Sequence, residues 1–317
     1  MEVDRKKLGV NVLGGGLHDR TWIHRGGDVN IWFQPLSLEE LETVGNKLYG
    51  CKSDFVTIGH TSNIYFRNTF NIDYVIDTRK LNHLAEVDGS TIECWCGTPT
   101  KTIARYCVEH GYSRYEGLID LPGTIAGAVV NNAGCFGCGI DNVLKYIEIL
   151  KEDGTICTVE RDELNYRFRN SSLKDGTLKG IILRVFLDIS EKKDCSVLKK
   201  IAEQNHRIRL FSQDPPSNNL GSTINVIGNF KGGKGLILRM IRKTLNMLRI
   251  NKELNNKVLN NVLCIMFGYP YVAKYISTKR MSCFIWKDNG ADKAYDKYIY
   301  MMRSIFPKCS VEIQVFE

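Results

Sequence analysis

The chain has 317 residues, of which 43% are hydrophobic and 25% are charged, and it contains 7 prolines. This composition excludes a disordered, collagen-like or low-complexity polypeptide, and the length suits one large domain or two to three small ones. The formal net charge of +8 favours an anionic ligand, and it also fits weak contact with nucleic acid or an anionic membrane.

The cysteines and the hydropathy pattern bear on the compartment. No apolar run reaches the roughly 18 to 20 residues that span a bilayer, and the first residues lack the apolar stretch of a signal peptide. The 11 cysteines are odd in number, which favours reduced thiols. Cys94 and Cys96, and Cys135 and Cys138, match no known zinc knuckle in their spacing, so we predict structural thiols and no metal site. The expected location is the cytoplasm.

The first half of the chain alternates predicted strands and helices, which is typical of an α/β or α+β protein. Ser37 opens a helix in which Glu40 completes a capping box, and Gly50 ends it. Thr98 is expected to cap a second helix that ends at Gly111. Predicted strands cover residues 29–35, 54–59, 74–77, 91–97 and 180–189, and a hairpin is expected over residues 145–159.

Beyond residue 190 the pattern becomes helical, and we expect a domain boundary near residue 200. Apolar residues follow helical spacing over 236–248, and a further helix is predicted over 254–266. The segment 231–257 carries eight Lys or Arg residues and one Glu. A nucleic-acid helix is one interpretation, and a solvated helix face is favoured because the aromatic residues of a single-strand binder are absent there.

The segment Gly117–Gly137 is rich in Gly, Ala and Asn and otherwise apolar. Residues without bulk allow the backbone to approach a large flat group or a diphosphate closely, and main-chain N–H groups can bind anionic oxygens. The residues alone predict a ligand-cradling segment, with a tightly packed turn and buried helix as the alternative.

Together with several other motifs, this segment resembles the flavin-binding core of the UDP-N-acetylenolpyruvoylglucosamine reductases, the MurB-type family. The resemblance is dense over residues 20–190, thin after 222, and weak again at 281–296 and 310–316. The matching motifs, in family order, are IGHTSNIYF (58–66), LPGTIAGAVVNNAG (121–134), FRNSSLK (168–174), Gly221-Ser222 and Val311-Glu312-Ile313.

The resemblance implies an α+β protein with an FAD-binding fold of the vanillyl-alcohol-oxidase type. Two α/β lobes, residues 1–80 and 81–200, would hold FAD. A substrate-binding domain would cover 201–317, with the last strand, about 310–317, returning to the active site. The residues implied to contact FAD are Ile58, Gly59, His60, Thr61, Ser62, Asn63, Pro122, Gly123, Thr124, Gly127, Ala128 and Gly134.

The chemistry that the resemblance implies is a pair of hydride transfers, from NADPH to the flavin and from the flavin to an enolpyruvyl ether. By similarity, Arg169 and Glu312 would stabilise the negative charge that develops on the substrate, and Ser222 would protonate the adjacent carbon. The implied partner is a small nucleotide-sugar, with no membrane partner and nucleic acid disfavoured.

Several positions depart from the family pattern, mostly on the substrate side. The loop after Ser222 reads TINVIGN where an aromatic-Lys-Asn-Pro sequence is usual, and Asp214 stands in place of a proline. Thr61 replaces a glycine of the diphosphate loop. We therefore keep three alternatives open: a diverged paralogue that acts on another nucleotide-sugar, a flavin-fold oxidase, and a binding protein without turnover.

Overall fold

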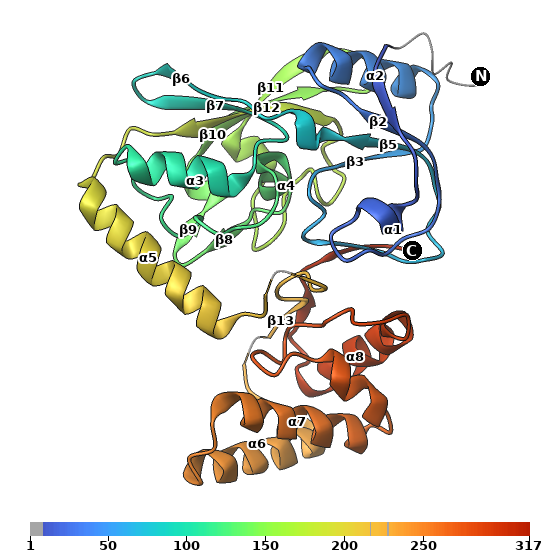
Figure 1. Ribbon diagram of the computed structural model, residues 1–317, viewed down its shortest axis with the longest axis vertical. Helices are drawn as coiled ribbons and strands as arrows, with labels where there is room; N and C mark the ends of the chain where they lie inside the picture. Colours follow the sequence, from blue (N-terminus) through green and yellow to red (C-terminus); the bar gives the residue numbers. More distant parts are fainter. Residues whose placement is uncertain (1–8, 216, 227) are drawn as a thin grey trace. The chain divides into compact units, whose positions relative to one another are not determined.

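The computed structural model describes residues 9–215, 217–226 and 228–317, and these residues form two compact units (Figure 1). Of these residues, the first unit contains 9–19, Gly27–Thr61 and Phe70–Ile208. The second contains Arg20–Gly26, Ser62–Thr69 and Arg209–Glu317. Two short segments from the N-terminal part of the sequence therefore belong to the same unit as the C-terminal third.

A mixed four-stranded sheet opens the first unit, in the order β1-β2-β5-β3. Strands β2, β5 and β3 run parallel, and β1 pairs antiparallel with β2. Ser37 accepts a hydrogen bond from the N–H of Glu40, which confirms the predicted helix start. The bounds are β1 Asn11–Leu13, α1 Leu17–Arg20, β2 Val29–Gln34, α2 Leu38–Gly50, β3 Phe55–Ile58 and β5 Ile72–Asp77.

A second, antiparallel sheet follows in the order β11-β10-β12-β7-β6. Helices α2 and α4 both pack on β12, and one hydrophobic core joins the two sheets through side chains such as Phe33, Leu41, Ile92 and Val185. The bounds are β6 Leu84–Asp88, β7 Thr91–Trp95, α3 Thr100–Glu109, α4 Ile125–Val130, β8 Gly134–Cys135, β9 Cys138–Gly139, β10 Leu144–Leu150, β11 Ile156–Glu160, β12 Ile181–Asp188 and α5 Cys195–Ser212.

The second unit is mainly helical, and its core is aromatic. Trp286 and Tyr295 pack around Tyr65 with ring centroids 5.1 and 5.0 Å from its ring. The C-terminal strand β15 pairs parallel with β4, and β13 pairs antiparallel with β14. The bounds are β4 Ile64–Phe66, β13 Ile224–Asn225, α6 Gly232–Met247, α7 Lys252–Met266, α8 Ala291–Ile305, β14 Ser310–Val311 and β15 Gln314–Phe316.

The α+β class is confirmed, and so are the hairpin around Asp153-Gly154 and the helices near 236–248 and 254–266. The predicted cap at Thr98 is wrong, because Pro99 precedes α3 and makes no side-chain cap. The buried hydroxyl of Thr98 instead donates to the carbonyl of His83 and accepts from its N–H. No helix in the described ranges is long and apolar enough to cross a membrane.

Candidate active site

Gly59 follows β3 and lies directly against Thr124, the residue that caps α4 (both belong to the first unit). A Cβ on Gly59 would stand 2.3 Å from Oγ1 of Thr124 and 2.8 Å from its Cγ2. The hydroxyl of Thr124 accepts a hydrogen bond from the N–H of Gly127 at 3.4 Å. The structure therefore brings the two glycine-containing motifs of the sequence together, and Gly59 permits their close approach.

The turn before α4 and the loop after β3 share an unusual backbone. Gly123 has φ of +111°, and Thr61 has φ of +54° although its side chain is β-branched and buried. The left-handed region disfavours a β-branched residue, which explains why a glycine is the residue expected at position 61. Ile58 ends β3, and its carbonyl accepts from the hydroxyl of Thr78 at 2.9 Å. Ser62 and Asn63 continue this loop into the second unit.

Burial lowers the pKa of His60 below its ordinary value of 6.5, and interaction with the backbone of Gly123 only partly opposes this effect. The imidazole is therefore neutral at pH 7. A neutral ring on this loop adds no positive charge beside Arg79 and Lys101, the two nearby cations that also lower its pKa.

We expect acid to destabilise the first unit through His60. Between its lowered folded pKa and about 6.5, the unfolded chain binds more protons than the folded one, so the free energy of unfolding rises with pH in that window. Urea unfolding at several pH values across the window checks this, and His60→Gln should flatten the rise while His18→Gln, at an exposed histidine, should not. If the free energy of unfolding of His60→Gln rises with pH as steeply as that of wild type, His60 is not the group responsible.

Arg169 lies on the loop after β11, and its guanidinium donates to the carbonyls of Asn132 and Gly134. Its own φ is +54°, a strained conformation for a residue with a side chain. Lys174 donates to the carbonyl of Arg169 at 3.0 Å, and Ser171 donates to Val130 at 2.7 Å. The motif around Arg169 therefore packs along the end of the glycine-rich run, and two of the five guanidinium N–H groups are engaged there.

Ser222 and Glu312 lie in the second unit beside a pair of short strands: Ser222 comes two residues before β13, and Glu312 directly follows β14. The N–H of Glu312 donates to the carbonyl of Thr223 at 3.0 Å, immediately before the β13–β14 pairing. Asn63 donates its side-chain N–H to the carbonyl of Glu312 at 3.3 Å, and its own carbonyl accepts from Gln314 at 2.9 Å. The structure therefore brings together three predicted residues that are separated by up to 249 positions in the sequence.

Sequence reasoning missed Arg280, whose Nη1 donates to Oγ of Ser222 at 3.3 Å. The hydroxyl of buried Ser277 donates to the carboxylate of Asp214 and accepts from the N–H of Lys279 and of Arg280. Asp214 is one of the departures from the family pattern, and here it anchors the loop that carries Arg280. The sequence signal that could have pointed to Arg280 was the cationic pair Lys279-Arg280, which directly precedes a largely apolar stretch.

A cavity of about 460 Å³ in the second unit adjoins Arg280. Its lining includes four cationic residues and no acidic residue. Asn255 is buried, donates to Asn246 at 2.7 Å and leaves its Oδ1 without a hydrogen-bond partner among the described residues. The lining residues are Arg242, Asn246, Ile250, Lys252, Asn255, Asn256, Lys279, Arg280 and Met281.

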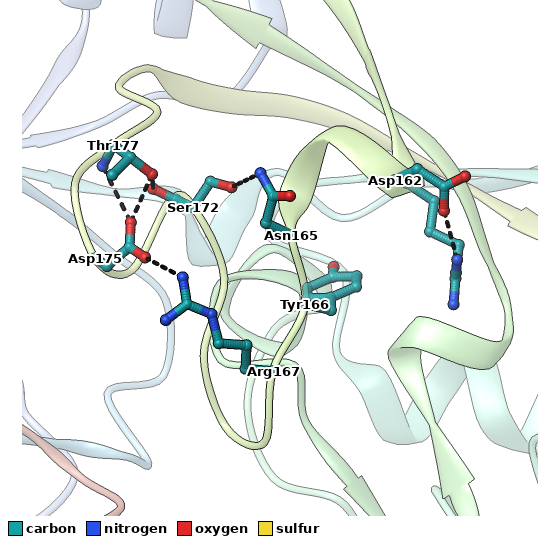
Figure 2. A pocket seen from close by; sticks show the side chains of 8 residues that line it. Asp162, Asn165, Tyr166, Arg167, Ser172, Asp175 and Thr177 are labelled. Carbon is teal, nitrogen blue, oxygen red and sulfur yellow. Dashed lines mark hydrogen bonds and ion pairs between the residues drawn. The ribbon is translucent and has the colours of Figure 1, made fainter.

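A larger cavity of about 610 Å³ lies in the first unit beside the loop that follows β11 (Figure 2). Its charges are mostly matched within its own wall: Asp175 faces Arg167, with Nη2 and Oδ2 3.8 Å apart, and Arg161 bonds Asp162. Because its cations already have acidic partners, this cavity is a weaker candidate for an anionic ligand than the one beside Arg280.

The residues of the first unit fit the FAD that the sequence implies. Gly127 is exposed, and a Cβ there would meet only Thr124, at 3.5 Å, so the backbone beside it is open to a flat or extended ligand. Pro122 is exposed, and Ala128 is buried in the core of the first unit. Oδ1 of Asn132 is buried without a partner in the described part of the chain, and it can receive a ligand donor.

The four predicted thiols are structural. Cys94 and Cys96 are buried in the core of the first unit, and burial raises the pKa of Cys96 to about 12. Cys135 donates to the carbonyl of Gly117 at 2.8 Å, and Cys138 accepts from its N–H at 3.3 Å. These sulfur atoms therefore fix the start of the glycine-rich run.

Comparison with known proteins adds independent information. A family model described as the FAD binding domain matches residues 30–160. The UDP-N-acetylenolpyruvoylglucosamine reductase of Aquifex aeolicus is 29% identical over 68% of this chain and 72% of its own length. That of Anaplasma marginale is 28% identical over 53% of this chain, and the chain spans 55% of that relative. The crystal structure of the MurB enzyme from Thermus caldophilus matches 97% of this chain and 100% of its own at a TM-score of 0.68 and 18% identity.

These matches define a protein with an FAD-binding fold of the vanillyl-alcohol-oxidase type, and the structural match establishes the fold. Within that class, the relatives and the solved structure that this chain resembles are UDP-N-acetylenolpyruvoylglucosamine reductases of the MurB type. The division at residues 80 and 200 remains a prediction, although the two sheets of the first unit occupy residues 11–77 and 84–188.

Proposed function

We propose that this chain is a flavin-dependent oxidoreductase that uses NADPH to reduce the enolpyruvyl ether of a UDP-N-acetylglucosamine derivative, a step of peptidoglycan precursor synthesis. The observation that carries the proposal is that Ser222 and Glu312 flank the paired strands β13 and β14, where Glu312 bonds the neighbour of Ser222, and that Arg280 both bonds Ser222 and lines a cationic cavity. NADPH and a nucleotide-sugar are cytoplasmic metabolites, in agreement with the expected location.

Ser222 is proposed as the proton donor to the substrate carbon. Arg280 donates a hydrogen bond to Oγ of Ser222, so this oxygen acts as an acceptor toward Arg280 and its own hydrogen is left to point elsewhere. The positive charge also favours the alkoxide that remains after proton transfer. Bound FAD would supply the hydride chemistry, taking a hydride from NADPH and delivering one to the substrate.

Arg169 and Glu312 are proposed to stabilise the charge that develops on the substrate carboxylate. The strained backbone of Arg169 and its bonds to Asn132 and Gly134 fix the guanidinium beside the glycine-rich run before substrate arrives. A donor fixed in advance needs no reorganisation during the reaction, which is the basis of electrostatic catalysis. The main chain of Glu312 is held by hydrogen bonds to Thr223 and Asn63, and its side chain would act as a carboxylic acid that donates to the substrate.

The cationic cavity is proposed to take the anionic part of the substrate. Lys252 lines this cavity and Lys257 does not, although both lie on α7. We expect Lys252→Met to raise the KM for the nucleotide-sugar about tenfold with kcat unchanged, because a lost charged contact costs about 1.5 kcal/mol. Lys257→Met is the matched control. Steady-state kinetics check this, and equal KM values in the two variants would contradict it.

A diverged paralogue acting on another nucleotide-sugar is the second candidate. It is favoured by the altered loop after Ser222 and by the replacement of a proline with Asp214, which bonds Ser277. This candidate predicts the same flavin chemistry with a different preference among nucleotide-sugars.

The first experiment is the visible spectrum of the purified protein, followed by anaerobic NADPH and then by UDP-N-acetylglucosamine enolpyruvate. A flavin spectrum that bleaches with NADPH and recovers with the enolpyruvyl substrate would support the proposal. Bleaching that only another nucleotide-sugar reverses would support the paralogue. A protein that takes up FAD but is not reduced would point to a binding protein, and one that never takes up FAD would overturn the proposal.

A further inference from the structure

Helix α6 has an unpartnered apolar face. The spacing of residues 236–248 predicts an apolar face turned to the core, yet only part of it is buried. Leu238 is fully buried, whereas the stripe Leu236, Met240 and Met247 is 53%, 61% and 76% exposed. Ile237 and Leu248 extend this outward face and are 48% and 66% exposed. We call these five residues the α6 outer face.

Positively charged residues lie along one side of the α6 outer face. The segment from Lys231 to Lys252 contains seven cationic residues and no acidic residue. Arg239 and Lys243 lie one and two turns along the helix from Leu236, on the flank next to the outer stripe, and both are exposed. Arg242 points away from this face and lines the cationic cavity. The outer face is therefore apolar with a purely positive border.

The chemistry of this face selects one kind of partner. A helix with aliphatic residues on one side and Lys and Arg beside them lies in the interface of an anionic bilayer, with the apolar side chains among the acyl chains and the cations at the headgroups. A single-stranded nucleic acid would need aromatic residues for base stacking, and the outer face has none. A second copy of the same face would place two positive borders together, which is unfavourable.

We propose that the α6 outer face docks on an anionic phospholipid surface, so that the protein is peripheral to a membrane. This goes beyond the proposed reaction and does not depend on it. It also differs from the expectation of no membrane partner, because the sequence alone did not show that Met240 and Met247 are exposed. With 16 residues and four cations, α6 would lie on the bilayer and not span it.

The test is sedimentation of the full chain with two kinds of vesicle, one of equimolar phosphatidylglycerol and phosphatidylcholine and one of phosphatidylcholine alone. Both are measured at 150 mM salt, where the Debye length is about 8 Å. Wild type should sediment with the anionic vesicles and about tenfold less with the neutral ones. The double variant Met240→Glu/Met247→Glu should lose about tenfold in binding, since two apolar anchors become like-charged with the lipid.

The control is Val87→Glu/Ile156→Glu, which makes the same charge change at exposed apolar residues of the first unit. It should bind as wild type does. Met and Glu have similar helix propensity, so α6 should persist in the Met double variant, and circular dichroism checks this. Wild type that ignores anionic vesicles, or equal losses in the two double variants, would overturn the proposal. A dimer in light scattering that only the Met double variant dissociates, without vesicle binding, would overturn it in favour of a second copy.

Discussion

Ser222→Ala is expected to be reduced by NADPH at the wild-type rate and to reduce the enolpyruvyl substrate about 10² to 10⁴ times more slowly. The proposed role of Ser222 is to give a proton to the substrate carbon, and loss of a positioned general acid costs about this factor. The hydroxyl is not required when NADPH delivers its hydride, so the first half-reaction should be unaffected. Stopped-flow absorbance of the flavin measures the two half-reactions separately.

The matched control for this prediction is Ser282→Ala. Ser282 belongs to the same unit and holds Thr223 and Ile224 through its main-chain carbonyl, which the substitution keeps. Its two half-reactions should match wild type. If Ser222→Ala instead slows both half-reactions equally, the effect is on the flavin environment or on folding, and the proton-donor role is wrong.

Gly59→Ala is expected to cost the first unit about 1 to 3 kcal/mol and to lower its FAD occupancy. The new Cβ would stand 2.3 Å from Oγ1 of Thr124, so either the loop after β3 or the cap of α4 must move. Both segments belong to the proposed FAD cradle. Urea unfolding gives the free-energy change, and the ratio of flavin to protein absorbance gives the occupancy.

Thr124→Ala provides a second variant that makes this prediction specific. It removes Oγ1 and Cγ2, the two atoms nearest to the added Cβ, at the expense of the helix cap. The double variant should be more stable than the sum of the two single effects, because only the Cβ of residue 124, at 3.1 Å, remains close to the added Cβ. Gly89→Ala, where a Cβ meets nothing within 4 Å, should be nearly neutral. Strict additivity would show that Gly59 is not constrained by Thr124.

Local patterns in the sequence predicted the elements that depend on local chemistry. The capping box at Ser37 and the Asp153-Gly154 hairpin are confirmed because each is decided within a few residues. The cap at Thr98 was wrong because a distant partner, the backbone of His83, takes its hydroxyl. Strands β1 and β6 were missed for a related reason, since each is a short edge strand defined by its partner.

The site residues likewise fall into those that a local motif identifies and those that only a distant contact defines. The glycine-rich motifs identified the residues around Gly59 and Thr124, because close backbone approach restricts the residue type at those positions. Arg280 could not be found, since its significance depends on a contact with Ser222 across 58 positions. The exposure of Met240 on α6 is likewise a tertiary property that helical spacing does not contain.

The pairing of β15 with β4 determines which fragments of this protein can be expressed without losing a strand partner. A fragment that begins at Arg209 would contain the helices of the second unit and lack Ser62–Thr69, which supply the partner strand and Tyr65 of the aromatic core. Such a fragment would expose an unpaired strand edge, which promotes aggregation. To exchange this unit between relatives, the three coding segments for Arg20–Gly26, Ser62–Thr69 and Arg209–Glu317 must therefore be exchanged at the same time. A single crossover between β4 and β15 would combine one of these strands with a partner from another protein.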